Sequence, residues 1–96
     1  MILHEHMEIA KKVKKLVHEI DPSAKVYVFG SVVRNEATTA SDIDVLVITR
    51  EVGRKYDIMI KVFREADERV ELHVVDEAMF DRWYRRFIPE DELVGV

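Results

Sequence analysis

The sequence contains no cysteine and no glutamine, and glycine, proline and asparagine are rare in it. The absence of cysteine excludes a disulfide framework and thiolate metal ligands, and it is typical of proteins that work in a reducing cytoplasm. No apolar run approaches the ~20 residues that a membrane-spanning helix needs. The first residues lead directly into a charged helical pattern, without the features of a secretory signal. We therefore expect a cytoplasmic protein with no membrane partner.

The composition is that of one globular domain. The chain has 96 residues, of which 48% are hydrophobic and 35% are charged. This balance excludes intrinsic disorder, and the length is too short for two domains. We expect a single domain over residues 1–96. The net charge of −4 argues against a nucleic-acid partner, because proteins that bind phosphate backbones usually carry an excess of Lys and Arg.

Three segments show the three-to-four-residue apolar spacing of an amphipathic helix. The first covers residues 3–20, and its histidines are expected at the surface. The second covers about 54–68, and its inner stripe includes Phe63. The third follows Asp76, a candidate N-cap, and ends at Pro89, leaving a short acidic tail.

Three shorter segments are rich in β-branched and aromatic residues, which predicts strands at 25–29, 43–49 and 70–75. The order α-β-(turn)-β-α-β-α predicts an α/β (α+β) domain in which helices cover a small three-stranded sheet. Only about a dozen residues join the first two strands, too few for a comfortable helical crossover. We therefore expect these two strands to be antiparallel and the sheet to be mixed.

Two aspartates, Asp42 and Asp44, lie at the start of the second predicted strand. Residues two apart on a strand project from the same face, with Cα atoms roughly 6.6 Å apart. Their carboxylates can converge on one hard cation, or bridge two cations about 3.5–4 Å apart. The apolar residues that follow keep the surroundings dry, so two uncompensated charges would be costly there. We expect a metal site, the alternative being a solvent-facing strand end.

Gly30 and Ser31 follow the first strand directly, and ten residues separate them from Asp42. Glycine reaches positive φ and lets a ligand approach the backbone, while a serine hydroxyl can bond a phosphate oxygen. Arg34 lies one turn further on, where a guanidinium can hold a triphosphate bidentately; a surface ion pair is an equal alternative. Asn35 tolerates a left-handed conformation in a tight turn.

This region resembles the nucleotidyltransferase motif of the DNA-polymerase-β-like superfamily, in which Gly-Ser is followed about ten residues later by Asp-x-Asp between hydrophobic strands. The resemblance is carried by Val26-Tyr27-Val28-Phe29-Gly30-Ser31, by Arg34, and by Ser41-Asp42-Ile43-Asp44-Val45-Leu46-Val47. A chain this short is similar to the minimal nucleotidyltransferases of that superfamily. The resemblance implies the nucleotidyltransferase fold, a nucleoside triphosphate substrate with ATP favoured, and two Mg²⁺ or Mn²⁺ ions as cofactors.

The resemblance also implies roles for individual residues. Asp42, Asp44 and a third carboxylate on the neighbouring strand are the expected catalytic residues and metal ligands. Glu71 fills the third place, where many relatives carry Asp. His73 shares a strand face with Glu71 and is expected as a packed or hydrogen-bonded neighbour rather than a ligand. The residues implied to bind the nucleotide are Gly30, Ser31, Arg34 and Ser41.

The implied reaction is in-line attack of an acceptor hydroxyl on the α-phosphate, with pyrophosphate leaving. Minimal members of the superfamily are often paired with a HEPN-domain protein as toxin and antitoxin, so the resemblance implies such a partner, with a homo-oligomer as the alternative. Two other functions stay open: an inactive module that masks its partner, and a small-molecule nucleotidyltransferase.

The last predicted helix carries more aromatic surface than so small a domain easily covers, which favours a protein contact there. Its aromatic residues are Phe80, Trp83, Tyr84 and Phe87.

Overall fold

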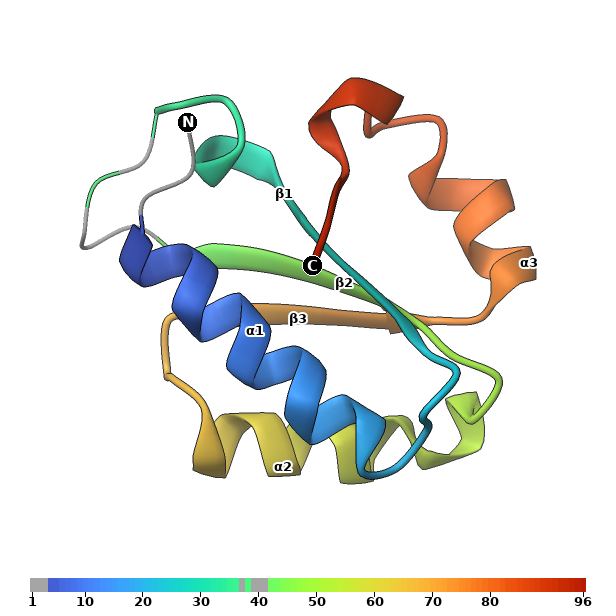
Figure 1. The fold of residues 1–96 in the computed structure, drawn as a ribbon. Coiled ribbons are helices and arrows are strands. Elements are labelled where there is room, and N and C mark those ends of the chain that lie inside the picture. Colours follow the sequence, from blue (N-terminus) through green and yellow to red (C-terminus); the bar gives the residue numbers. More distant parts are fainter. Residues whose placement is uncertain (1–3, 37, 39–41) are drawn as a thin grey trace.

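Helices and strands alternate along the chain in a computed structural model that describes residues 4–36, 38 and 42–96 (Figure 1). The order expected from the sequence is confirmed, with short additions near the C-terminus. The main elements are α1 (His4–His18), β1 (Lys25–Phe29), β2 (Ile43–Ile48), α2 (Lys55–Glu65), β3 (Val70–Val75) and α3 (Glu77–Met79). Among the described residues, every helix is too short or too polar to span a bilayer.

The sheet is mixed, as predicted, but it has four strands in the order β3-β2-β1-β4. β1 and β2 are antiparallel, and β2 and β3 are parallel. The additional strand is β4 (Val94–Gly95), which pairs antiparallel with β1 through Tyr27 and Val28. The prediction of three strands was therefore wrong. Two paired residues in a short acidic tail leave no periodic pattern from which a strand could be read.

The two faces of the sheet are covered by different parts of the chain. Val45 and Val47 of β2 belong to the main core, together with apolar residues of α1 and α2. Leu46 and Ile48 of the same strand belong to a second cluster on the opposite face, which includes Phe80 from the C-terminal segment. In Figure 1, α1 and α2 accordingly lie on one side of the sheet and α3 on the other. The second face is covered over only part of its length, which leaves room for a site.

Two side chains on the helices lie elsewhere than the sequence pattern indicated. His6 was expected at the surface, but it is fully buried. It lies four residues before Ala10, so it shares the apolar face of α1. Phe63 was placed on the inner stripe of α2, but it is 74% exposed. Each residue turns a helix by 100°, so Phe63 points well away from its buried neighbour Val62.

The last predicted helix is not a regular α-helix. Asp76 caps it as expected, and its Oδ1 accepts a hydrogen bond of 2.8 Å from the backbone N–H of Met79. After α3 the chain continues as a π-helical turn, η3 (Phe80–Tyr84), which the hydrogen bond from Arg85 N–H to the Phe80 carbonyl closes at 3.0 Å. A π turn is wider than an α turn, and such turns occur frequently at functional sites.

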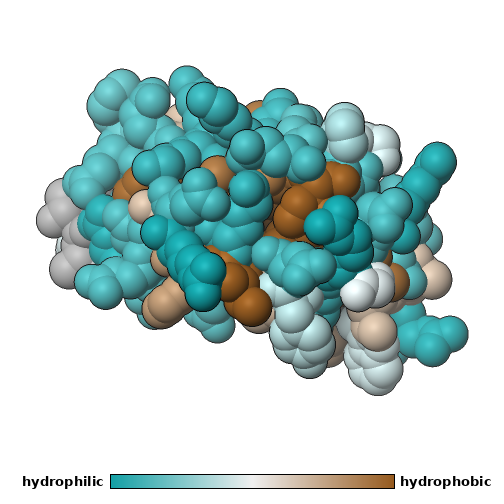
Figure 2. All heavy atoms as spheres, turned by 90° about the horizontal axis from the view of Figure 1, so that it is seen from below, coloured by the Kyte–Doolittle hydropathy of each residue, from teal (hydrophilic) through white to brown (hydrophobic). Residues whose placement is uncertain are grey.

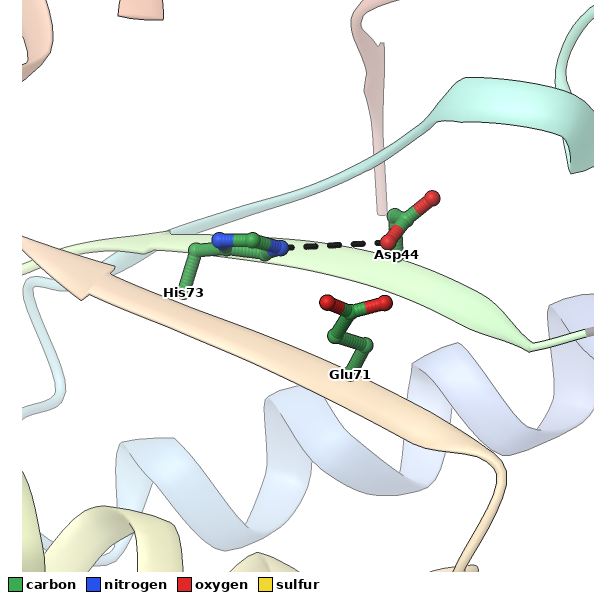
Figure 3. Close-up of side chains that lie close together, drawn as sticks. All are labelled: Asp44, Glu71 and His73. Atoms are coloured by element: carbon green, nitrogen blue, oxygen red, sulfur yellow. Dashed lines mark ion pairs between the residues drawn. The ribbon is translucent and has the colours of Figure 1, made fainter. Parts of the chain in front are cut away.

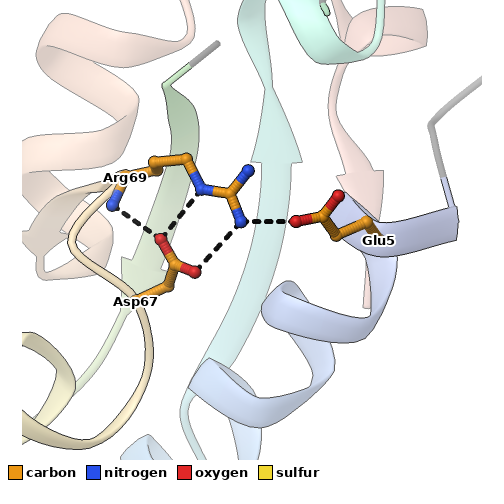
Figure 4. Close-up of polar contacts among 3 residues, drawn as sticks. All are labelled: Glu5, Asp67 and Arg69. Carbon is orange, nitrogen blue, oxygen red and sulfur yellow. Dashed lines mark hydrogen bonds and ion pairs between the residues drawn. The ribbon is translucent and has the colours of Figure 1, made fainter. Parts of the chain in front are cut away.

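Two polar clusters fix the connections between elements. The carboxylate of Asp21 is buried and accepts hydrogen bonds from the hydroxyls of Ser23 and Thr49, each at 2.6 Å. It therefore holds the turn after α1 against the end of β2. In the second cluster, Arg69 bonds both oxygens of Asp67 and donates to Glu5 at 2.6 Å (Figure 4). That contact ties the start of β3 to the first turn of α1.

Candidate active and metal site

Acidic and imidazole side chains gather on the part of the second sheet face that the C-terminal segment leaves open. Asp44 of β2 lies opposite Glu71 of β3 in the parallel register, and Leu46 lies opposite His73. Because alternate residues of a strand share a face, Glu71 and His73 project toward the same side as Asp44. Figure 3 shows these three side chains on that side of the two strands. One ligand atom from each lies within 4.8 Å of the others.

The electrostatics of this group favour a bound cation. The pKa of Asp44 is raised above its ordinary value, first by the loss of hydration on burial and then by the negative charge of nearby Glu71. Two facing carboxylates repel one another, and a cation relieves that repulsion. Glu71 is exposed, whereas the Asp44 side chain keeps only 25% of its surface accessible. The pair therefore combines a partly buried carboxylate with one that solvent can reach.

His73 is held between aromatic rings with one nitrogen facing the carboxylates. Its ring centroid lies 5.3 Å from that of Phe29 and 5.7 Å from that of Tyr84. Its Nδ1 lies 3.3 Å from the Tyr84 hydroxyl, and its Nε2 lies 3.8 Å from Oδ1 of Asp44. That second distance is too long for a hydrogen bond. Nε2 is buried and has no hydrogen-bond partner in the part of the chain that the structure describes.

Gly30 places the turn after β1 directly against Asp44. The strand pairing sets Phe29 opposite Asp44, so the next residue passes over the carboxylate. Gly30 has φ +83°, and a Cβ built on it would collide with Oδ2 of Asp44. Both the backbone conformation and the clearance thus require glycine. Asn35 adopts φ 61°, the left-handed conformation that the sequence indicated.

A cleft of about 350 Å³ is lined by two members of this group, Asp44 and His73. One wall comes from Gly30 and Arg34, and the opposite wall from residues 84–92 of the C-terminal segment. The Arg34 side chain makes ion pairs with Glu36 at 3.4 Å and with Glu92 at 3.9 Å. The guanidinium lines the cleft while it also bridges the two walls. It is therefore placed to exchange a carboxylate partner for a phosphate.

The structure does not bring every predicted residue into this group. Asp42 lies just before β2 and is exposed, and its carboxylate is not one of the three within 4.8 Å. Ser31 is half-buried on the 3₁₀ turn η1 (Gly30–Val32) and does not line the cleft. Ser41 lies outside the described residues. His73 was expected as a packed or hydrogen-bonded neighbour rather than a ligand, although its spacing of two from Glu71 was a signal for a shared site.

The donor set fits a divalent cation. Two carboxylates supply the oxygen ligands that such ions prefer, and the buried Nε2 of His73, 3.8 Å from Oδ1 of Asp44, is a further donor without a hydrogen-bond partner among the described residues. The close contact between Gly30 and Asp44 restricts the orientation of that carboxylate. Asp44 and His73, which line the cleft, and Glu71, which lies opposite Asp44 on β3, are thus the side chains that could hold an ion.

Comparisons with known proteins identify the family and the fold. The family model of the nucleotidyltransferase domain matches residues 7–96. The crystal structure of a protein from Sulfolobus solfataricus, provisionally named a nucleotidyltransferase, is 28% identical, with a TM-score of 0.59; the match covers 94% of this chain and 80% of that one. A second crystal structure, of a protein with the same provisional name, is 24% identical and shares the fold with a TM-score of 0.70, over 90% of this chain and 95% of that one. No curated protein matches the chain. The family match covers nearly the whole sequence, and the chain belongs to the nucleotidyltransferase domain family.

Proposed function

We propose that this nucleotidyltransferase transfers a nucleoside monophosphate, AMP from ATP, to a hydroxyl group of a partner protein. The proposed metal ligands and catalytic residues are Asp42, Asp44 and Glu71, with Mg²⁺ or Mn²⁺ as cofactor and two ions in the working site. Membership of the family gives the enzyme class. The nucleotide, the acceptor and the residue roles are the content of the proposal.

The observation that carries the proposal is the contact between the Gly30 turn and Asp44. It places the backbone turn after β1 directly beside a carboxylate with a raised pKa. Nucleotidyl transfer needs these two elements together, because the phosphates must be held where the charge of the reaction is stabilised. Arg34 lines the same cleft and adds a positive charge for the triphosphate.

Each side chain then has a distinct task. Gly30, Ser31 and Arg34 bind and orient the triphosphate, and Ser41 completes this set in the proposal. Glu71 is exposed and can accept the proton of the attacking hydroxyl, while Asp44 lines the cleft and lies against the Gly30 turn. A divalent ion bound to the carboxylates would polarise the α-phosphate and stabilise the charge on the departing pyrophosphate.

The acceptor is proposed to lie on a second protein, of which a HEPN-domain protein is our first candidate. The exposed apolar side chains support a protein contact. Near the C-terminus, Trp83 and Phe87 are 49% and 77% exposed, and we call these two residues the aromatic surface. Met79, in the preceding turn, is 44% exposed. On the side that carries α2, further hydrophobic side chains emerge in the middle of an otherwise hydrophilic face (Figure 2). Phe87 also lines the cleft, so a partner on the aromatic surface would lie beside the site.

A masking role without catalysis is the second candidate. The absence of Asp42 from the three-residue group favours it, because a metal site with fewer carboxylates holds its ion more weakly. In that case the chain would bind its partner through the aromatic surface, with no nucleotide transferred.

The deciding experiment is a transfer assay with α-labelled ATP, CTP, GTP and UTP, each with Mg²⁺ or Mn²⁺. Candidate acceptor proteins are added in turn, beginning with any HEPN-domain protein encoded beside the gene. We expect metal-dependent labelling of the acceptor with ATP, and none with the Asp44→Asn variant. A stable complex that never becomes labelled with any nucleotide would instead support the masking role.

A further inference from the structure

We infer that His73 is itself a metal ligand, and that its nitrogen makes this site prefer divalent transition-metal ions over Mg²⁺. This inference rests on the proposed metal site at Asp44 and goes beyond it, because it names a ligand outside the carboxylate set and the class of ion that the set selects. The three donors, two carboxylate oxygens and one imidazole nitrogen, already lie within 4.8 Å of one another.

The position of Nε2 is the first support. It is buried, it faces Asp44 across 3.8 Å, and it has no hydrogen-bond partner among the described residues. A buried polar atom without a partner is costly, so its persistence needs an explanation. A simple ion pair with Asp44 would close to about 2.7–2.9 Å. Two ligand atoms that share one ion instead stay roughly 3 Å or more apart, since each bond to the ion is about 2.0–2.2 Å long.

The other nitrogen of the ring is the second support. Nδ1 lies 3.3 Å from the hydroxyl of Tyr84. When Nδ1–H donates to that oxygen, the lone pair of Nε2 is left free toward the carboxylates. Metal-binding histidines usually donate their second N–H in this way, which fixes both the tautomer and the orientation of the ring. Phe29 and Tyr84 also restrict the ring sterically. Tyr84 therefore acts as a positioning residue for His73.

The chemistry of the donors gives the selectivity. Mg²⁺ prefers oxygen ligands in octahedral geometry and keeps several waters, so an imidazole contributes little to its binding. Mn²⁺, Co²⁺ and Zn²⁺ accept imidazole nitrogen readily, and their affinities for a mixed N/O site increase from Mn²⁺ toward the later metals. The group of Asp44, Glu71 and His73 should therefore bind Co²⁺ and Mn²⁺ more tightly than Mg²⁺.

The test measures metal binding directly, on the full chain and without nucleotide. Affinities for Mg²⁺, Mn²⁺ and Co²⁺ are obtained by calorimetry, and pulsed electron paramagnetic resonance of the Mn²⁺ complex detects coupling to imidazole nitrogen. We expect the wild type to show this coupling and to bind Co²⁺ at least about 10-fold more tightly than Mg²⁺. In His73→Gln the coupling disappears and the Co²⁺ affinity falls by about 10- to 100-fold.

Two further variants keep the result interpretable. Tyr84→Phe retains the ring contact but removes the hydroxyl, so it should weaken Co²⁺ binding by a smaller factor than His73→Gln does. His4→Gln replaces an exposed histidine of α1 and should leave metal binding unchanged. If the wild type shows no nitrogen coupling, or if His73→Gln lowers Mg²⁺ and Co²⁺ affinity equally, the inference is overturned. Transfer activity of the same wild-type preparation shows separately whether the proposed function stands.

Discussion

At the scale of single residues, the site depends on how closely a carboxylate approaches a backbone turn. Gly30 has no Cβ, and Oδ2 of Asp44 occupies the space where a Cβ would lie. The turn therefore limits the positions open to the Asp44 carboxylate, while Glu71 and His73 approach it from the neighbouring strand. A small substitution at Gly30 should therefore displace the Asp44 carboxylate from the other metal ligands while the overall fold is retained.

Gly30→Ala tests this dependence. The new methyl group meets Oδ2 of Asp44, and the positive φ costs an L-residue about 1–2 kcal/mol. We expect a loss of stability of at least that size in urea unfolding, together with loss of metal binding and of transfer. Gly53→Ala is the matched control, because a Cβ there meets nothing within 4 Å. Intact metal binding in Gly30→Ala would contradict the proposed role of the turn.

Asp44→Asn should abolish metal binding without lowering the stability of the metal-free protein. Burial and the charge of Glu71 raise the pKa of Asp44, which means that ionising this carboxyl costs more free energy in the folded protein than in the unfolded chain. Without metal, the neutral amide removes this repulsion, so the urea midpoint should stay equal or rise at pH 7. Metal binding should be lost. A clear fall in the metal-free midpoint would show instead that the carboxylate contributes a stabilising contact.

Local spacing predicted where Gly30 and Asp44 lie, a turn glycine after the first strand and a carboxylate on the second. Glu71 was implied only by the resemblance to the family; it lies opposite Asp44 on β3, and the catalytic roles of these residues stay predictions. His73 packs on its neighbours as expected, but the ligand role inferred for it was not predicted, because it depends on Tyr84, which lies eleven residues further on, in a π-helical turn that no sequence pattern indicates. Asp42 lies just before β2 and is exposed, so its spacing of two from Asp44 does not place it in the three-residue group, and its role as a metal ligand stays a prediction.

At the scale of elements, buried polar contacts set how the helices and strands connect. Asp21 joins the turn after α1 to the end of β2, and its hydrogen bonds with Ser23 and Thr49 lower its pKa from 3.8 to about 2. Arg69 performs the corresponding task at the other end of the sheet, and its contact lowers the pKa of Asp67. Both contacts join segments that are distant in the sequence.

The Asp21 contact predicts a specific dependence of stability on pH. A carboxyl whose pKa is lowered by folding stabilises the protein above its unfolded pKa and loses that effect as the pH falls toward its folded pKa. The contribution should therefore be complete above about pH 4 and disappear toward pH 2, by roughly 2 kcal/mol. Urea titrations of the wild type and Asp21→Asn should converge over this range. Parallel curves would exclude the buried ionised carboxylate.

The sequence predicted element order and sheet type well, because apolar periodicity is strong over α1, β2 and β3. It failed where tertiary contact decides the outcome. β4 is a strand only because β1 offers it an edge, and the hydrogen bond from Val96 N–H to the Val26 carbonyl at 3.0 Å continues that pairing. Phe63 was assigned to the inner stripe of α2 from its three-to-four-residue spacing, but it lies at the edge of that stripe, where the sheet does not cover it, and it is 74% exposed.

At the scale of the whole molecule, the exposed apolar side chains are the feature most in need of a partner. Phe87 of the aromatic surface and Phe63 of α2 are about equally exposed, at 77% and 74%. Only Phe87 lies beside the cleft. This pair allows a matched comparison of two exposed phenylalanines in different places.

We expect Phe87→Ser and Phe63→Ser each to change the free energy of unfolding by no more than about 0.5 kcal/mol, as exposed substitutions usually do. Phe87→Ser should weaken association with the partner protein at least 10-fold, measured by calorimetry, whereas Phe63→Ser should not. The reverse result would move the proposed contact from the aromatic surface to α2.

The far wall of the cleft is joined to the sheet through β4, a strand of two residues at one edge. So short a pairing contributes few hydrogen bonds, and sheet edges that are held this way open locally far more often than the centre does. Ligand binding and the pairing of β4 with β1 are then thermodynamically linked. If pairing of β4 raises the affinity for a ligand that contacts both walls of the cleft, that ligand should slow amide hydrogen exchange in β4 by the same factor. The affinity of the cleft for its ligand would thus depend in part on the two-residue pairing of β4 with β1.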